Sequence, residues 1–432
     1  MTFADLRAAA LFVTSPDGHT DDDRLQAAFA LLRAKAPVYW VESPGVRPFW
    51  LITRHADVMA VELRGAPFAV APRSFLSSEA GEASMRQVSG KPDVLRGLVQ
   101  MDDPDHGAYR DIALPWFTSA RLADLESWVA DCAHEAVGRI TGRADVFDFA
   151  AVAAAFPMRV TMHILGLPAS DDQLILKLAR GLTGAEDPDR SLSDRPAESI
   201  RLAGVEMRDY FNRVTADRRE RPTEDLSSAI ANARIHDMPI PDYERLSYFM
   251  QLAIAGQENT GCCIAGGLHA LLTHPAQWAK LRAEPALLDR AIEEMLRWTS
   301  PARHLIRTAI ADTEIGGHRI RAGEAVLIFF NSANRDETVF EAANSFQIDR
   351  DPNPHLAFGL GRHFCLGAQL ARLELRALFR ALLPKLLAAE VVGSTRRARS
   401  AAISGISFLP IKCLWRSDPS HTSSSARQAV GI

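Results

Sequence analysis

The stretch Phe358-Gly359-Leu360-Gly361-Arg362-His363-Phe364-Cys365-Leu366-Gly367 sets one cysteine among glycines. Glycine allows a tight turn that brings backbone N–H groups toward the sulfur. Apolar residues then recur at helical spacing, which predicts a helix directly after Cys365, at Leu366, Leu370, Leu373 and Ala377. The N-terminus of a helix favours a thiolate. The stretch therefore predicts a metal-ligating cysteine tuned by hydrogen bonds, and the alternative is a small buried cysteine in a turn.

The pattern Phe-x-x-Gly-x-His-x-Cys-x-Gly, from Phe358 to Gly367, resembles the haem-binding loop of the cytochrome P450 superfamily. The resemblance implies that Cys365 is the axial thiolate ligand of the iron in haem b (iron protoporphyrin IX). Phe358, His363 and Gly367 would then be haem-binding residues of the same loop. It extends over about residues 38–415 and implies a mainly α fold with a minor β region, a triangular prism of helices around a buried haem.

The composition is that of an ordinary globular enzyme. The 432 residues are 47% hydrophobic and 24% charged, and the net charge of −4 gives no electrostatic basis for binding nucleic acid. The five cysteines include no CxxC pair or zinc spacing, as in a reducing cytoplasm. No run approaches the about 18–20 apolar residues of a membrane span, and no signal peptide is recognisable. We therefore expect a cytoplasmic monomer without a membrane anchor.

The sequence predicts how the chain is divided into a domain, a tail, strands and irregular segments. One catalytic domain is expected over residues 1–415, followed by a polar, disordered tail over 416–432. Short strands are predicted near 38–62, 305–330 and 395–415, and the rest is mostly helical. Residues 66–100 are expected to form a loop over the site. Residues 331–355 lack sustained periodicity, which indicates a functional or buttressing role.

Glu294 and Arg297 lie three positions apart and share one face of a predicted helix. Taken alone, such a pair is most often a solvated surface pair. About 70 residues before the cysteine loop, however, Glu-x-x-Arg resembles the K-helix pair of the family. The resemblance implies a buried ion pair joined by a basic residue of the irregular segment, for which we choose Arg350. Its role would be to shape the core beside the haem.

The segment Ala255-Gly256-Gln257-Glu258-Asn259-Thr260 falls within a helix predicted from about Tyr243 to Leu272. A glycine inside a helix often marks a kink or a close approach of a ligand, although an exposed polar patch is the alternative. The segment resembles the oxygen-binding stretch of the family, with Glu258 as the acid. Asn259 stands where the family has a threonine. Because one residue rotates a side chain by about 100°, Thr260 cannot take Asn259's direction. Glu258, Asn259 and Thr260 are the catalytic candidates.

Four basic residues match positions that, in the family, bind the propionate groups of the haem. His106 and Arg110 lie four residues apart on one helix face, and Arg307 and His363 match two further positions. Ala255, Ala302, Leu305 and Ile403 match substrate-pocket positions, although each is equally explained as core. On the helix after Cys365, a stripe of Arg372, Arg376 and Arg380 is either a solvated face or a docking site for an acidic ferredoxin.

The resemblance implies a haem-thiolate monooxygenase that inserts one oxygen atom from O2 into a small or medium organic substrate, by hydroxylation or epoxidation. Electrons would come from NAD(P)H through a separate ferredoxin reductase and ferredoxin, and the substrate is free or carrier-bound. Two alternatives stay open. Asn259 is compatible with oxidative coupling, desaturation or peroxide-driven oxidation on the same fold. The other is a non-catalytic haem-binding sensor or assembly partner.

Overall fold

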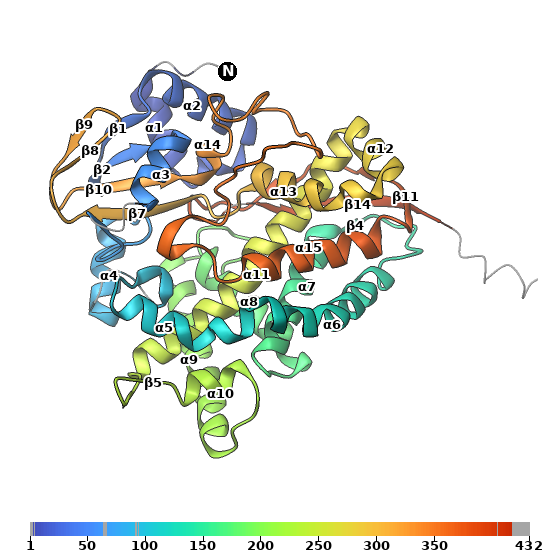
Figure 1. Cartoon of the computed structure of the whole chain (residues 1–432), viewed down its shortest axis with the longest axis horizontal. Helices are drawn as coiled ribbons and strands as arrows, with labels where there is room; N and C mark the ends of the chain where they lie inside the picture. Colours follow the sequence, from blue (N-terminus) through green and yellow to red (C-terminus); the bar gives the residue numbers. More distant parts are fainter. Residues whose placement is uncertain are drawn as a thin grey trace, which may run out of the picture.

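The computed structural model describes residues 3 and 5–416, apart from 64–66, 91–92, 94 and 404. Helices form most of the molecule, and the main sheet lies at the upper left of Figure 1. The predicted class, mainly α with a minor β region, is confirmed. Of the tail predicted over 416–432, only Arg416 is among the described residues.

The α-helices account for most of the described chain. Their bounds are α1 Leu6–Thr14, α2 Asp22–Lys35, α3 His55–Leu63, α4 Glu79–Ser89, α5 Asp105–Ala113, α6 Ser119–Gly138, α7 Phe149–Ile164, α8 Asp172–Thr183, α9 Pro196–Glu220, α10 Leu226–Ala231, α11 Asp242–Thr273, α12 Pro275–Ala283, α13 Leu288–Thr299, α14 Phe330–Ala333 and α15 Ala368–Leu382. Short 3₁₀ turns lie between them at Asp17–Thr20, Leu98–Gln100, Leu114–Phe117, Ala169–Asp171, Pro285–Leu287 and Gly361–His363.

The main sheet has the strand order β1-β2-β10-β7-β3. Its strands are β1 Val38–Ser43, β2 Val46–Ile52, β3 Phe68–Ala69, β7 His304–Ala309 and β10 Ala325–Phe329. Every residue of β10 is buried, which explains its uninterrupted apolar sequence. Strand β10 pairs parallel with β2 and antiparallel with β7, so the N-terminal hairpin and the segment after α13 share one sheet.

The remaining strands form smaller units. A three-stranded sheet has the order β11-β14-β4, with bounds β4 Phe147–Asp148, β11 Leu386–Val391 and β14 Pro410–Trp415. Three two-stranded pairs are β5 Arg234–Ile235 with β6 Met238–Pro239, β8 Thr313–Ile315 with β9 His318–Ile320, and β12 Arg396–Arg397 with β13 Ile406–Phe408. The last pair lies in the predicted β region near 395–415.

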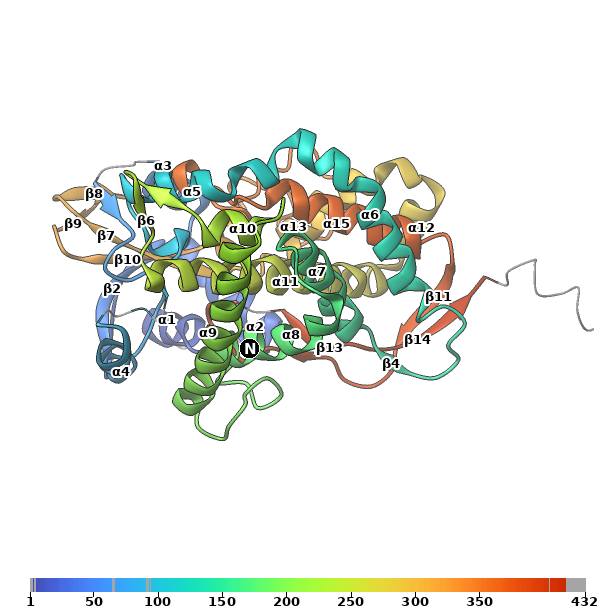
Figure 2. The same ribbon diagram turned by 90° about the horizontal axis from the view of Figure 1, so that it is seen from below.

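Helix α11 passes through the middle of the molecule, with α7 and α15 packed against it (Figure 2). It was predicted within one residue at each end. The helix continues without interruption through Gly256. A Cβ at Gly256 would lie 2.3 Å from Oγ1 of Thr161 on α7, so the glycine permits close packing of α7 on α11. This helix–helix contact is a packing reason for the glycine, and the approach of a ligand at Gly256 stays a prediction.

Two segments differ from prediction. The strands near 38–62 end at Ile52, and His55–Leu63 is the helix α3. Residues 66–100 were expected to be a loop, yet they contain α4. The N-cap Ser78 accepts a hydrogen bond from the N–H of Gly81, and Gly90 ends the helix in the left-handed conformation. These two capping signals were present in the sequence and were overlooked.

Candidate functional site

Cys365 lies between the 3₁₀ turn Gly361–His363 and α15. Its N–H donates to the carbonyl of Phe358 (2.9 Å), and its own carbonyl accepts from the N–H of Ala368 (3.4 Å). Gly359 and Gly361 have φ angles of +65° and +62°, which glycine adopts without strain. The glycines thus let the chain reverse twice before the cysteine. Helix α15 begins three residues after Cys365, later than predicted.

The Cys365 thiol is not made acidic by the helix alone. Burial raises the pKa of this thiol above its ordinary value, and the N–H of Gly367 only partly opposes that effect. The N–H at the start of the helix acts in the expected direction on the pKa of Cys365, but in the protein chain by itself burial outweighs it. A metal cation bound to the sulfur would supply the missing stabilisation. Among the described residues, no group of three or more His, Cys, Asp or Glu could hold a metal ion.

A cavity of about 180 Å³ lies beside the cysteine loop. Three of the four predicted propionate residues line it, namely His106, Arg307 and His363. The rings of His106 and His363 are 4.2 Å apart between centroids. Arg110 of α5 donates through Nη2 to the carbonyl of Phe364 (2.9 Å), next to Cys365. Donors from α5, β7 and the cysteine loop thus converge, as the carboxylates of a haem require.

This group carries less positive charge than its sequence suggested. Burial, aided by the nearby arginines, lowers the pKa of His363 to about 3 and also lowers that of His106. Both imidazoles are therefore neutral hydrogen-bonding groups at pH 7. Arg307 pairs with Glu62 of α3 at 2.8 Å, and both side chains are buried. Sequence reasoning missed Glu62 because it read this helix as strands and turns.

Glu258 is buried near the middle of α11. It forms an ion pair with Nη1 of Arg190, and its other oxygen accepts from Nε2 of Gln257 at 3.2 Å. The exposed fractions of the Glu258 and Arg190 side chains are 2% and 7%. Arg190 lies between α8 and α9, and was missed because its segment has no periodic pattern. The pair shields the carboxylate from solvent.

Asn259 and Thr260 face different neighbours. The Oδ1 atom of Asn259 is buried and has no hydrogen-bond partner in the described part of the chain. Thr260 instead hydrogen-bonds Glu374 of α15, whose carboxyl pKa is raised well above its ordinary value by complete burial. The geometry thus keeps Thr260 out of the direction of Asn259. Glu374 had not been recognised as part of this region.

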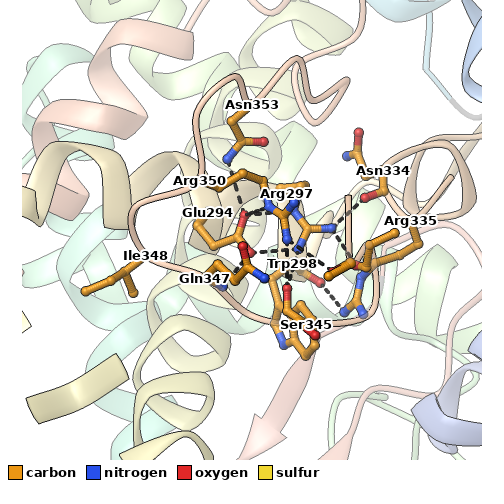
Figure 3. A network of polar contacts seen from close by, with 12 residues as sticks. Glu294, Arg297, Trp298, Asn334, Arg335, Ser345, Gln347, Ile348, Arg350 and Asn353 are labelled. Carbon is orange, nitrogen blue, oxygen red and sulfur yellow. Dashed lines mark hydrogen bonds and ion pairs between the residues drawn. The ribbon is translucent and has the colours of Figure 1, made fainter. Parts of the chain in front are cut away.

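Glu294 is the centre of a buried network (Figure 3). Its two oxygens accept from Nε and Nη2 of Arg297, both at 2.7 Å, and from Nε of Arg350 at 3.1 Å. The N–H of Gln347 also donates to it, at 2.8 Å. The side chains of Glu294 and Arg297 are completely inaccessible, so they are not a solvated surface pair. The irregular segment is thus held against α13 by a single carboxylate.

Arg297 extends the same network to the backbone. It donates to the carbonyls of Asn334 (2.8 Å), Ala343 (2.9 Å) and Ser345 (3.1 Å). These oxygens would otherwise be buried without partners, because the segment has little regular secondary structure. Arg297 therefore also provides hydrogen-bond donors for the backbone carbonyls of the loop that precedes the cysteine turn.

None of the four predicted pocket residues is fully buried. Ala255 is exposed, and Ala302, Leu305 and Ile403 are intermediate. Ala302 and Ile403 pair through an isolated antiparallel β-bridge, so the start of β7 and the turn after β12 are adjacent. In contrast, Cys262 and Cys263 are buried at 5% and 2% exposure, in keeping with a packing role.

The arginine stripe on α15 is largely neutralised. Arg372 makes two contacts with Glu293, at 2.7 and 2.8 Å, and Arg376 pairs with Asp289 at 2.6 Å. Both acids belong to α13. The stripe consequently serves in part to join two helices, and a docking surface for a ferredoxin would have less free charge than the sequence alone suggested.

The comparisons with known proteins agree with this architecture. The family model for cytochrome P450 matches residues 203–388. Cytochrome P450-terp of a Pseudomonas species is 37% identical over 93% of this chain and 96% of its own length. Linalool 8-monooxygenase of Pseudomonas putida is 31% identical over 89% of this chain and 94% of its own. The crystal structure of CYP108D1 from Novosphingobium aromaticivorans has a TM-score of 0.87 at 33% identity, and the match covers 96% of this chain and all of that one.

A haem-thiolate protein is the class that this fold and a lone cysteine ligand define, and the chain belongs to the cytochrome P450 family. It is a monooxygenase that uses haem iron and receives electrons from redox partners. The alternative of a non-catalytic haem sensor is not supported. No helix in the described part of the chain is long and apolar enough to span a membrane.

Proposed function

We propose that this enzyme inserts one oxygen atom of O2 into a C–H bond or a double bond of a small or medium apolar substrate. For hydroxylation, substrate, O2, two electrons and two protons give the alcohol and one water. The observation that carries the proposal is the placement of Cys365 in a glycine turn beside a cavity lined by His106, Arg307 and His363. One thiol with several hydrogen-bond donors nearby matches the needs of a haem with two carboxylates.

Each group of the site has a proposed role toward the haem. Cys365 would hold the haem iron through its sulfur, and Phe358 and Gly367 would complete its loop. Arg110 and Arg307 bind the carboxylates as cations, whereas His106 and His363 bind them through N–H groups. When bound, the haem supplies the activation of dioxygen by stepwise reduction. Glu294, Arg297 and Arg350 hold the surrounding backbone in place and take no part in the chemistry.

Proton delivery is assigned to Glu258 and Asn259. The carboxylate of Glu258 can exchange a proton with solvent only after its ion pair with Arg190 opens, because both side chains are buried. The buried Oδ1 of Asn259 can accept a hydrogen bond from an ordered water, and its amide can donate another. Asn259 would therefore position a water rather than pass a proton through a hydroxyl. Thr260 is committed to Glu374 and is assigned a structural role.

A second candidate reaction is favoured by the same residue. Asn259 lacks the hydroxyl of the family's threonine, so oxidative coupling, desaturation or peroxide-driven oxidation on this fold is the alternative. Peroxide already contains the reduced oxygen and needs less assistance from a proton relay. The two candidates differ in the source of the inserted oxygen and in the need for a reductase.

The decisive experiment uses the haem-loaded protein with ¹⁸O2. Candidate substrates are first selected by spectral displacement of the iron-bound water, beginning with linalool and other apolar alcohols and hydrocarbons, since a relative is named for linalool. Product is then measured with NADPH, ferredoxin and ferredoxin reductase, or with hydrogen peroxide alone. One ¹⁸O atom per product in the reductase reaction is expected. An unlabelled product, or a product formed only with peroxide, would favour the second candidate.

The partners and surroundings of the enzyme follow from the same proposal. Electrons come from NAD(P)H through a ferredoxin, which would contact the side of α15 where Arg380 lies. The enzyme would be a cytoplasmic monomer in one domain over residues 1–415, with a free or carrier-bound substrate. Titration of activity with ferredoxin would test the electron supply, and size-exclusion chromatography would test the monomeric state.

A further inference from the structure

Arg303 is an almost completely buried arginine that forms no salt bridge with any of the described residues. It lies just before β7, and only 1% of its surface is exposed. Its backbone is fixed, because its N–H donates to Ala402 (2.8 Å) and its carbonyl accepts from Phe330 (2.9 Å). Its Nε and Nη2 atoms have no hydrogen-bond partner in the described part of the protein. A guanidinium group in this setting is costly unless something else neutralises it.

Two further arginines bring positive charge to the same region. Arg335, with 3% exposure, lies over the ring of Trp298 at 3.4 Å and donates to the carbonyl of that residue at 3.3 Å (Figure 3). Arg397 of β12 contacts Asp22 of α2 at 3.3 Å, but its Nε has no partner among the described residues. Arg397 acts electrostatically on Arg303, and Arg303 acts on Arg335.

The negative charge available is too small to balance these groups. Asp22 is the acid that acts on both Arg303 and Arg335, and Glu294 is already engaged by Arg297 and Arg350. Three guanidinium groups thus share the carboxylate of Asp22, which already pairs with Arg397. In accord with uncompensated charge, burial and neighbouring arginines lower the pKa of Arg303 to about 10 and that of Arg335 to about 9.

Neutral hydrogen-bonding groups are also left over nearby. Asn331 is 2% exposed, and neither its Nδ2 nor its Oδ1 has a partner among the residues described. Asn331 directly follows Phe330, and the N–H of Phe330 donates to the carbonyl of Arg303. Unpaired donors from two buried side chains and an excess of positive charge are the features of an anion site, and buried water alone would satisfy only the hydrogen bonds.

We propose that the cluster of Arg303, Arg335 and Arg397 binds a small monovalent inorganic anion of the size of chloride. The near-complete burial of Arg303 and Arg335 favours a small ion over a phosphate or an organic acid. The anion would link the start of β7, the end of α14 and β12, three segments that are distant in sequence. It would also steady Ala302 and Ile403, whose β-bridge lies directly beside Arg303.

The first test measures Tm of the haem-loaded protein in sodium chloride and in sodium gluconate at equal ionic strength. Above its dissociation constant, chloride should raise Tm by about 1.5 °C for each tenfold increase in concentration, for a chain of this size. Arg303→Met should lose this dependence and should be at least as stable as the wild type in gluconate, because it removes an uncompensated charge. The control is Arg396→Met, an exposed neighbour of Arg397 that pairs with Asp189 and should keep the chloride response.

The second test needs no variant. Crystals of the wild-type protein soaked in bromide should show an anomalous peak within hydrogen-bonding distance of Nε or Nη2 of Arg303. Ordered water at that position, without bromide, would overturn the proposal. It would also be overturned if Arg303→Met lowered Tm equally in chloride and gluconate. Neither measurement depends on the oxidation reaction, so failure here leaves the proposed function intact.

Discussion

Glu258 and Arg190 form a buried ion pair that joins the middle of α11 to the segment between α8 and α9. The partner of the carboxylate is thus 68 residues away in sequence and lies outside any long helix. Next to this pair, the Oδ1 atom of Asn259 is buried without a partner in the described chain. A charged group that can move a proton and an amide that can hold a water are therefore adjacent on one helix.

Substitutions at Asn259 should change the coupling of electron consumption to product. Asn259→Ala removes the groups that hold a water, so more NADPH should be consumed per product formed. Asn259→Thr restores the family's hydroxyl and should retain or improve coupling. Both ratios are measured as NADPH oxidised against product. Product loss in Asn259→Thr together with normal coupling in Asn259→Ala would mean that Asn259 contacts substrate or packs, and does not serve a relay.

Glu258→Gln tests the acid separately. The amide has nearly the same volume but cannot release a proton, so turnover should slow by about 10²-fold or more while the haem spectrum stays unchanged. Arg190→Met removes only the partner and should speed proton exchange or destabilise the protein, but should not copy the Gln variant. Identical turnover in Glu258→Gln and wild type would remove Glu258 from the mechanism.

Cys365→Ser should abolish the red-shifted Soret band of the reduced carbon monoxide complex, because a hydroxyl is a much weaker and harder donor to iron than a thiolate. Cys132→Ser is the matched control, since Cys132 is also a partly buried free cysteine. That variant should keep the band. If the band survived in Cys365→Ser, a different residue would have to be the ligand.

Glu294→Ala and Arg297→Ala should each cost about 3–5 kcal/mol, because each leaves a buried charge without its partner. Poor expression and low haem occupancy are expected. Arg290→Ala on the same helix is the control: Arg290 and Asp351 form an exposed pair, 3.1 Å apart, and its loss should cost at most about 1 kcal/mol. Full haem occupancy in Glu294→Ala would contradict a structural role for the network.

The enzyme should lose stability in acid through His304. Its Nδ1 bonds the carbonyl of Ala401 at 2.8 Å and its Nε2 accepts from the N–H of Leu76 at 3.1 Å, so the buried ring must be neutral. Burial lowers the pKa of His304 from 6.5 to about 4. The unfolded chain therefore binds the extra proton between pH 6.5 and 4, and stability falls as the pH drops through this window.

At pH 5 this linkage amounts to roughly 2 kcal/mol. Urea unfolding at pH 7 and pH 5 should show a correspondingly smaller loss in His304→Gln, whose amide can replace both hydrogen bonds. His134→Gln, at an exposed histidine of α6, should behave as the wild type. An equal loss of stability in all three proteins would assign the acid sensitivity to other groups.

The sequence carried the fold class and the bounds of α11, because regular apolar spacing and the cysteine motif are local signals. It also pointed to Glu294, Arg297 and Arg350 through their motif positions. Charge states were not predictable in this way. His106 and His363 were counted as basic groups, and their neutrality depends on burial and on arginines contributed by other segments.

Residues without a local pattern were missed for the same reason. Arg190, Glu62 and Glu374 acquire their roles only from partners far away in the chain, at Glu258, Arg307 and Thr260. Gly256 shows how a tertiary contact adds to a local signal, because its missing side chain makes room for Thr161 of α7. Sequence spacing identifies which residues share an element, whereas tertiary contacts decide what each one faces.

Helix α11 is one unbroken run of 32 residues, about 48 Å long. Bending α11 near Glu258 would break backbone hydrogen bonds and disturb the close packing of Gly256 against α7. Any opening that admits protons must therefore come from the other member of the pair, the short connection around Arg190. The rate at which the segment around Arg190 moves away from Glu258 would then set an upper limit on the rate of catalysis. A substrate that contacts this segment would change that rate and so would regulate its own oxidation.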